Sequence, residues 1–235
     1  MTPASDLYFR QLAVGEMANF AYLVGSRRSR EALIVDPAWN IEGLIEHAEN
    51  DGMTVTGALV THYHQDHIGG SLFGHEIPGL ASLLERLPVP IHVNKQEAPG
   101  VASVADISRG ELSEHDAGDT IALGDLQIRL LHTPGHTPGS QCFLVEENGQ
   151  PSHLISGDTL FLGSCGRVDL PGSDPEAMYH SLQDTLKKLP DETLLFPGHL
   201  YSPEGQSTMG EQKQSNPFLR VTSLETFLSF MGVGS

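Results

Sequence analysis

Short apolar runs alternate with segments of helical periodicity along most of the chain, which is typical of an α/β protein. The clearest unit comprises a strand at 32–36, a helix at 40–50 with apolar residues every three or four positions, and a strand at 55–60. Gly52 suits the end of this helix because glycine readily adopts the left-handed conformation found there. The pattern therefore predicts a β–α–β unit whose second strand leads directly into a polar, histidine-rich stretch.

The other elements follow the same alternation, with turn residues between them. Gly124 and Asp125 supply a hairpin turn, and Asp174 with Pro175 gives a favourable helix start. The pattern is weakest over 71–105, where we expect the segment 73–78 to form a loop that overhangs the functional site. The remaining strands are expected at 7–14, 20–25, 91–93, 119–123, 126–131, 140–145, 154–157 and 193–196, and the helices at 80–87, 174–188 and 222–231.

Length and composition favour one domain that spans residues 1–235. The formal net charge of -17 argues against binding to nucleic acids or anionic membranes. No apolar run is long enough for a transmembrane helix, and Met1 to Arg10 lack a signal pattern. Cys142 and Cys165 do not make a disulfide framework. We therefore expect a cytoplasmic protein whose oligomeric state is open, a homodimer included.

Four side chains of types that can bind metals follow the strand ending at Val60 within a few positions: His62, His64, Asp66 and His67. His62 and His64 point the same way on extended backbone, and the other two converge with them where the chain turns sharply. Imidazole and carboxylate together suit Zn²⁺, Fe²⁺ or Mn²⁺ rather than Cu⁺. The alternative is a polar loop that is rich in histidine by chance.

Three further strands end in a residue of the same kind, which argues against chance. His136 lies between two Thr-Pro-Gly turns that make its loop stiff, Asp158 follows the strand at 154–157, and His199 follows the strand at 193–196. Because α/β proteins bind ligands at the carboxyl ends of their strands, we expect all these side chains to meet.

Several other residues have no clear role in this pattern. Asp36 ends a strand and serves equally well as a turn cap or as a neighbour of the site. His132 is expected to be structural or to support a ligand, and His75 and His92 to be surface or core residues. Cys165 is expected to be a small packed residue in a tight loop.

The motif His62-x-His64-x-Asp66-His67, followed by His136, Asp158 and His199, resembles the metallo-β-lactamase fold superfamily over roughly Val14 to Gly232. This resemblance implies an α/β (α+β) fold, a four-layer αβ/βα sandwich of two mixed β-sheets flanked by helices. Within the superfamily, segments such as Thr133-Pro-Gly-His136-Thr-Pro-Gly-Ser140, Gly157-Asp-Thr-Leu-Phe161 and Phe196-Pro-Gly-His199 are most similar to the glyoxalase II and persulfide dioxygenase branch.

The glyoxalase II pattern implies two metal ions, Zn²⁺ in the first instance and Fe²⁺ or Mn²⁺ as alternatives. One ion would be bound by His62, His64 and His136, and Asp158 would bridge to a second on Asp66, His67 and His199. The dioxygenase pattern implies a single iron on His62, His136 and Asp158. In glyoxalase II the positions of Arg167 and Tyr201 bind glutathione.

The resemblance therefore implies a hydrolase that cleaves a thioester or related ester with a metal-bound hydroxide, which Asp66 would orient. The substrate would be a small molecule, and one derived from glutathione fits the branch. A mononuclear iron dioxygenase acting on glutathione persulfide and a lactonase are alternatives, and a non-enzymatic metal-binding scaffold is a third. Asp169 and the short tail depart from glyoxalase II, and the tail is more similar to the dioxygenase branch.

Overall fold

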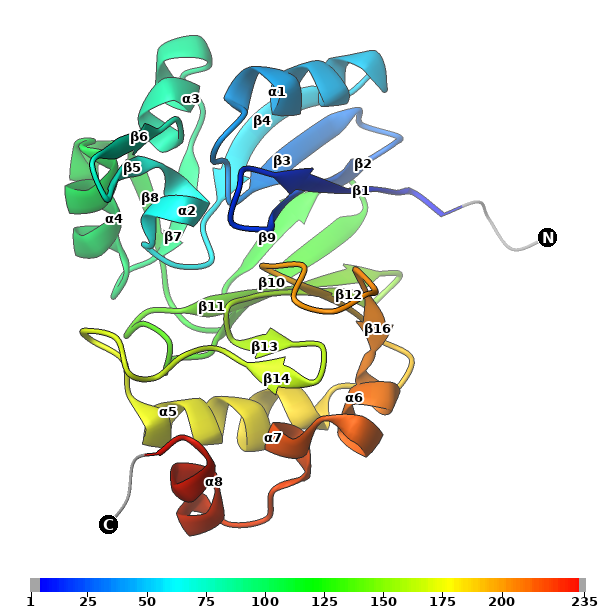
Figure 1. Cartoon of the computed structure of the whole chain (residues 1–235). Coiled ribbons are helices and arrows are strands. Elements are labelled where there is room, and N and C mark those ends of the chain that lie inside the picture. The colour runs from blue at the N-terminus through cyan, green and yellow to red at the C-terminus, as the bar shows by residue number, and fades with distance from the viewer. Residues whose placement is uncertain (1–4, 233–235) are drawn as a thin grey trace.

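The computed structural model describes residues 5–232, which fold into two facing β-sheets with helices on both outer faces (Figure 1). This architecture confirms the four-layer sandwich that the sequence predicts. Both sheets have six strands and both are mixed, because each contains parallel and antiparallel pairs. In spatial order the first sheet contains β1 (Leu7–Val14), β2 (Asn19–Ser26), β3 (Glu31–Val35), β4 (Thr54–Leu59), β7 (Ile91–Asn94) and β8 (Leu112–His115).

The second sheet is built from the C-terminal half of the chain. Only β12 and β15 are parallel neighbours in it, so their carboxyl ends reach the same edge of the sheet. In spatial order this sheet contains β16 (Ser207–Thr208), β15 (Leu194–Pro197), β12 (Gln150–Gly157), β11 (Gln141–Glu147), β10 (Leu126–His132) and β9 (Thr120–Leu123).

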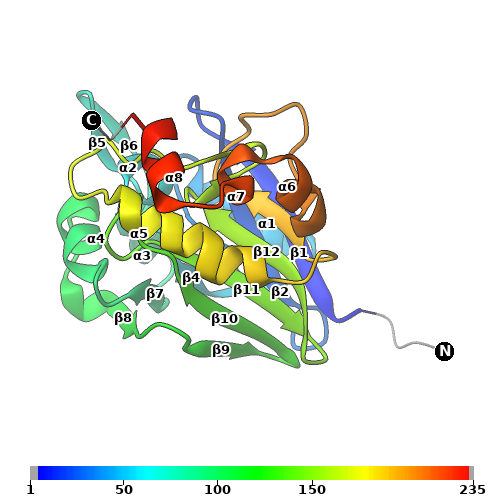
Figure 2. The ribbon, with the colours of Figure 1, turned by 90° about the horizontal axis from the view of Figure 1, so that it is seen from below.

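Helices cover the two outer faces of the sandwich, as the turned view in Figure 2 also shows for the C-terminal half. The first sheet is covered by α1 (Ile41–Asn50), α3 (Leu80–Arg86) and α4 (Ala98–Ala105), and the second by α5 (Pro175–His180), α6 (Met209–Ser215), α7 (Pro217–Arg220) and α8 (Leu224–Phe230). The minor elements are α2 (Gln65–Ile68), the hairpins β5 (Gly70–Leu72)–β6 (His75–Ile77) and β13 (Leu160–Phe161)–β14 (Ser164–Cys165), and a 3₁₀ turn at Arg109–Glu111.

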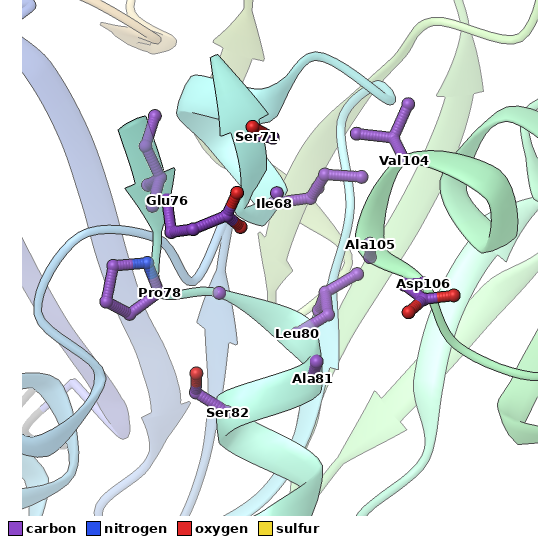
Figure 3. Close-up of a pocket in the computed structure, with 13 residues that line it drawn as sticks. Ile68, Ser71, Glu76, Pro78, Leu80, Ala81, Ser82, Val104, Ala105 and Asp106 are labelled. Atoms are coloured by element: carbon purple, nitrogen blue, oxygen red, sulfur yellow. The ribbon is translucent and has the colours of Figure 1, made fainter. Parts of the chain in front are cut away.

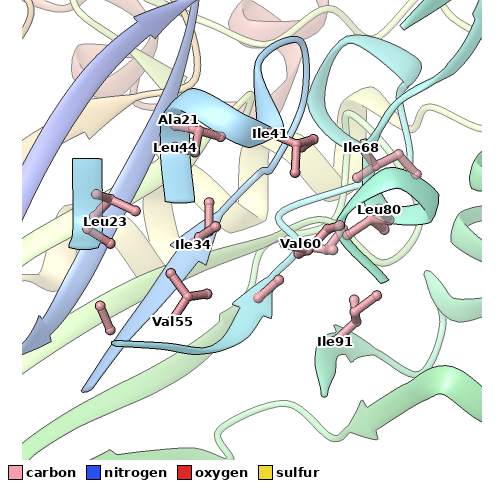
Figure 4. Close-up of a cluster of buried hydrophobic side chains, with 14 of the residues drawn as sticks. Ala21, Leu23, Ile34, Ile41, Leu44, Val55, Val60, Ile68, Leu80 and Ile91 are labelled. Atoms are coloured by element: carbon pink, nitrogen blue, oxygen red, sulfur yellow. The ribbon is translucent and has the colours of Figure 1, made fainter. Parts of the chain in front are cut away.

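Strand alternation produces three apolar layers, because successive side chains of a buried strand point to opposite faces. In β2, Tyr22 packs between the sheets while Leu23 faces the outer layer under α1 (Figure 4). In β11, Phe143 packs between the sheets while Leu144 faces the outer layer under α5. The rigid sheets thereby fix the strand ends from which the predicted ligand residues project.

The structure corrects the sequence prediction in several places. The expected helix at 174–188 is α-helical only to His180; it continues as a π-helical turn at Ser181–Thr185 and a 3₁₀ turn at Leu186–Lys188. Where the helix widens, the Ser181 hydroxyl donates a hydrogen bond to the Pro134 carbonyl oxygen. The sequence analysis also missed α4, which lies in the region of weakest pattern, and β8, which follows it.

The expected loop at 73–78 is the tip and second strand of the β5–β6 hairpin. Phe73 at the tip is 91% exposed and lines a cavity of about 380 Å³ together with Met17 and Trp39. Another cavity, of about 440 Å³, lies behind α2 between this hairpin, α3 and the end of α4 (Figure 3). No histidine lines this second cavity. Of the helices in residues 5–232, none has the length and apolar character needed to cross a membrane.

Candidate metal centre

The seven side chains that the sequence predicts as metal ligands meet at one edge of the sandwich. β4 leads into His62 and His64, and α2 carries Asp66 and His67 directly after them. The other three, His136, Asp158 and His199, follow the ends of β10, β12 and β15 in the second sheet. The prediction that these strand ends converge is confirmed.

The first group of donors, here called the imidazole cluster, consists of His62, His64 and His136. One nitrogen of each lies within 4.8 Å of the others, and His136 Nε2 is 3.0 Å from His64 Nδ1. The three rings meet edge to face, with centroids 4.7–4.9 Å apart. This spacing allows three nitrogen atoms to bind one cation.

The second group, here called the acidic cluster, consists of Asp66, His67 and His199. Its donor atoms also lie within 4.8 Å of one another, and the two Nε2 atoms are 3.1 Å apart. Asn19, which the sequence analysis missed, donates from Nδ2 to Asp66 Oδ2 at 2.9 Å. Asn19 begins β2 and bridges to His199 in the backbone, and a buried asparagine at a strand start gives only a weak signal in sequence.

The Asp158 carboxylate lies between the two clusters. Its Oδ2 atom is 3.5 Å from His136 Nε2 and 3.4 Å from His199 Nε2, and its Oδ1 atom is 3.4 Å from His67 Nε2. Gly198 makes this approach possible, because a Cβ atom there would lie 2.4 Å from Asp158 Oδ1. One carboxylate can therefore contact both clusters.

Backbone carbonyls fix the orientation of two of the histidines. His136 Nδ1 is 2.9 Å from the Arg167 carbonyl oxygen, and His199 Nδ1 is 3.0 Å from the Met17 carbonyl oxygen. Since a carbonyl oxygen only accepts hydrogen bonds, each Nδ1 donates to it, and each Nε2 faces the site.

Asp36 and Thr61 orient two more histidines. Asp36 accepts hydrogen bonds from the Thr61 amide and hydroxyl, and its Oδ2 lies 3.1 Å from His67 Nδ1. Because the Thr61 hydroxyl donates to Asp36, it accepts from His62 Nδ1 at 2.9 Å. Asp36 thus fulfils both roles considered from sequence, as a turn cap and as a neighbour of the site. His62 and His67 also present Nε2 to the site.

Burial and charge affect the two clusters differently. Burial and neighbouring imidazoles lower the pKa of His62 well below its usual value and that of His64 to about 4. Burial also acts to lower the pKa of His67 and His199, but the carboxylates of Asp66 and Asp158 outweigh it. They raise the pKa of His67 to about 9 and that of His199 to about 10. The acidic cluster therefore attracts positive charge.

The donor atoms fit a bound cation. In residues 5–232, the buried atoms His62 Nε2 and Asp158 Oδ1 have no hydrogen-bond partner, which is costly for buried polar groups. The Nε2 atoms of His67 and His199 lie 3.1 Å apart and both face the Asp66 and Asp158 carboxylates, so a positive charge between them is favourable. Imidazole nitrogen and carboxylate oxygen are ligands that Zn²⁺, Fe²⁺ and Mn²⁺ accept.

The two residues assigned to substrate by resemblance lie beside the site. Arg167 and Asp169 form an exposed ion pair, with 2.8 Å between guanidinium nitrogen and carboxylate oxygen, and it is the Arg167 backbone carbonyl that contacts a predicted ligand, His136. The Tyr201 ring stacks on His199, with centroids 4.6 Å apart and an interplanar angle of 9°. Tyr201 is 62% exposed and is accessible to a small molecule.

The other residues considered from sequence lie outside the clusters. His132 Nε2 donates to the Pro138 carbonyl oxygen at 3.0 Å. This hydrogen bond connects the two ends of the loop that carries His136, so the role of His132 is structural. His75 is exposed, and His92 is half-buried against His115. Cys165 packs in the outer core layer of the second sheet, where burial raises its thiol pKa to about 12, so the predicted packing role is confirmed.

A family model described as the metallo-beta-lactamase superfamily matches residues 14–199. The chain belongs to the metallo-beta-lactamase superfamily. Two curated relatives are each 31% identical to it. The mitochondrial persulfide dioxygenase ETHE1 of Homo sapiens aligns with 97% of this chain and 82% of its own length, and a probable hydroxyacylglutathione hydrolase of Schizosaccharomyces pombe with 90% and 86%.

Solved structures of the superfamily have the same fold. ETHE1 from Myxococcus xanthus superposes with a TM-score of 0.79 at 30% identity, covering 96% of this chain and 90% of that one. The protein TTHA1623, solved in a di-iron-bound form, superposes with a TM-score of 0.69 at 32% identity, covering 89% of this chain and all of that one. Relatives of this superfamily member are thus named both as hydrolases and as dioxygenases.

Proposed function

We propose that this protein is a metal-dependent hydrolase of the glyoxalase II type, which cleaves a thioester or a related ester of a small molecule. The observation that carries the proposal is the position of Asp158, whose carboxylate contacts both the imidazole cluster and the acidic cluster. A shared carboxylate between two sets of three donors is what a site for two divalent ions needs.

The ligands for each ion follow from the two clusters. His62, His64 and His136 would hold one ion, Asp66, His67 and His199 the other, and Asp158 would bind both. When bound, divalent ions supply Lewis-acid polarisation of a carbonyl group and lower the pKa of water. Zn²⁺ is the first candidate, and the same donors accept Fe²⁺ or Mn²⁺.

The chain's own groups would prepare the site for hydrolysis. Asn19 holds Asp66 Oδ2, and the Trp39 indole donates to the Asp66 carbonyl oxygen at 2.9 Å, so this carboxylate is fixed where it can orient a water molecule. Tyr201, stacked on His199, and Arg167 lie where a substrate would approach. Their roles in binding are part of the proposal.

A mononuclear iron persulfide dioxygenase is the second candidate. It is favoured by the ETHE1 relatives, which align with nearly the whole chain. In this case His62, His136 and Asp158 would hold one iron, and His64 would support the site without binding the metal. A lactonase would use the same two-ion site as the hydrolase.

Elemental analysis combined with a substrate panel tests the proposal. Purified protein would be assayed with thioesters that include hydroxyacylglutathione, with lactones, and with glutathione persulfide while oxygen uptake is followed. We expect two divalent ions per chain and thioester hydrolysis without oxygen uptake. One iron per chain together with oxygen consumption on the persulfide would replace the hydrolase by the dioxygenase.

A further inference from the structure

A buried carboxylate outside both clusters connects the segments that carry the imidazole cluster. Glu97 directly precedes α4, does not cap the helix with its side chain, and is 0% exposed. Its Oε1 atom accepts hydrogen bonds from the Tyr63 amide at 2.9 Å and from the Thr137 hydroxyl at 2.6 Å, and its Oε2 atom accepts from the Gly139 amide at 2.7 Å. One side chain thus joins three chain segments.

These contacts lie next to ligand residues. Tyr63 stands between His62 and His64, and Thr137 directly follows His136. Glu97 therefore joins the strand end that carries two members of the imidazole cluster to the loop that carries the third. In the described part of the chain, no member of the acidic cluster donates a hydrogen bond to Glu97.

The joint around Glu97 is tightly packed. A Cβ atom on Gly139 would lie 2.5 Å from the backbone nitrogen and from Oε2 of Glu97, and one on Gly100 would lie 2.6 Å from the Tyr63 ring. Within residues 5–232 Glu97 has no basic partner, so its negative charge depends on the three donors. A buried carboxylate without a counter-ion is costly, which argues that these contacts serve more than packing.

We infer that Glu97 is a positioning residue, which fixes the distance between the His62–His64 strand end and the His136 loop and thereby sets the metal affinity of the imidazole cluster. The inference rests on the proposed metal site. It gives a role to the segment 71–105, since Glu97 reaches the site from there.

Glu97→Gln tests this inference because it keeps the side-chain shape but removes one acceptor. An amide group cannot accept on both sides, so at least one of the three donors loses its partner. We expect Zn²⁺ affinity at the imidazole cluster, measured by competition with a chelator, to fall about 10–100-fold. Amide hydrogen exchange at Tyr63 and Gly139 should become faster. Glu85→Gln, the same change at an exposed position of α3, is the matched control and should leave both readouts unchanged.

A double-mutant cycle with His64→Ala separates positioning from general destabilisation. Because His64→Ala already disables the imidazole cluster, adding Glu97→Gln should weaken the remaining site little further. Unchanged affinity in Glu97→Gln, or an equal loss in both backgrounds, would overturn the inference. If Glu97→Gln does not fold, Thr137→Val removes one donor and should give a smaller loss in the same direction; unchanged affinity there would also overturn it.

Failure of the proposed function gives a different result. If the wild-type protein binds a single iron through His62, His136 and Asp158, the two-ion hydrolase is wrong. Glu97→Gln should still weaken that iron, because two of its three ligands lie on the segments that Glu97 joins. Two ions in the wild type with no effect of Glu97→Gln would leave the hydrolase standing and remove only the role of Glu97.

Discussion

The imidazole cluster and the acidic cluster share Asp158 but differ in charge. Burial and like neighbours lower the pKa of His62 and His64, so these rings are neutral at physiological pH. The carboxylates around His67 and His199 raise the pKa of both rings, so these hold protons under the same conditions. A cation entering the first cluster meets free lone pairs, whereas one entering the second displaces protons.

The same contrast appears in the support around each cluster. Glu97 holds the imidazole cluster through the backbone on both of its sides. Asn19 and Asp36 hold the acidic cluster through direct contacts with Asp66 and His67. We therefore expect the metal affinity of these two neighbouring clusters to be set by different means. Preorganised geometry would set it in the imidazole cluster, and charge in the acidic cluster.

Removal of the shared carboxylate should have the largest effect. Asp158→Ala takes one ligand from each cluster, and we expect hydrolysis to fall by at least about 10²–10³-fold, as for loss of a group that stabilises the transition state directly. Metal content, measured on the same sample, should fall in both clusters. Asp184→Asn, which changes an exposed carboxylate on the π-helical turn after α5, is the control. Full activity of Asp158→Ala on every substrate would contradict the shared site.

His64→Ala changes the imidazole cluster and leaves the acidic cluster intact. In a two-ion hydrolase it removes a ligand of the imidazole cluster, and we expect one ion per chain and activity lowered about 10–100-fold. In a one-iron dioxygenase the change should be milder, because iron is then held by His62, His136 and Asp158. Elemental analysis beside the kinetic assay distinguishes the two cases, and iron retained with near-normal oxygen uptake would exclude the two-ion site.

The pH dependence of metal binding should differ between the clusters. Protons compete with the metal at His67 and His199, whose pKa values are about 9 and about 10, so affinity of the acidic cluster should rise with pH through neutrality. The expected slope is about tenfold per pH unit for each displaced proton. The imidazole cluster, with the pKa of His64 at about 4, should lose affinity only in acid.

Two variants isolate the clusters for this measurement. His64→Ala leaves the acidic cluster intact, and His67→Ala leaves the imidazole cluster intact. Chelator competition at about pH 6 and about pH 8 should give a steep change in the first variant and a shallow one in the second. If metal affinity depended equally on pH in the two variants, the proposed difference in charge between the clusters would be wrong.

Arg167→Ala should have the smallest effect. The Arg167 side chain is exposed and paired with Asp169, and an exposed ion pair contributes little to stability because solvent screens it. The backbone carbonyl that orients His136 is unchanged by this substitution, so kcat and metal content should stay near wild type. A rise in KM confined to anionic thioesters would assign Arg167 to substrate binding. A loss of metal would show that its side chain supports His136.

The seven candidate ligand positions could be predicted from the sequence because they lie within a few residues of the ends of four strands with a clear apolar pattern. The turn chemistry around His136, with proline and glycine on both sides, made that position especially clear. Because α/β proteins bind ligands at the carboxyl ends of their strands, the sequence also predicted that these strand ends meet.

The supporting residues could not be predicted in the same way. Asn19, Thr61 and Glu97 act through a few side-chain hydrogen bonds, and in Asn19 and Glu97 the partners lie more than thirty positions away along the chain. The helix that follows Glu97 was also missed, because the segment 98–105 has no charged residue to mark an exposed face. Such contacts depend on how loops pack, which hydrophobic periodicity does not specify.

The most direct test of the shared site is a crystal structure of the metal-loaded protein with anomalous scattering used to locate and identify the ions. We predict two peaks, one against His62, His64 and His136 and one against Asp66, His67 and His199, with the Asp158 carboxylate contacting both. A single iron peak bound by His62, His136 and Asp158, with His64 and His199 turned away from it, would contradict the two-ion hydrolase.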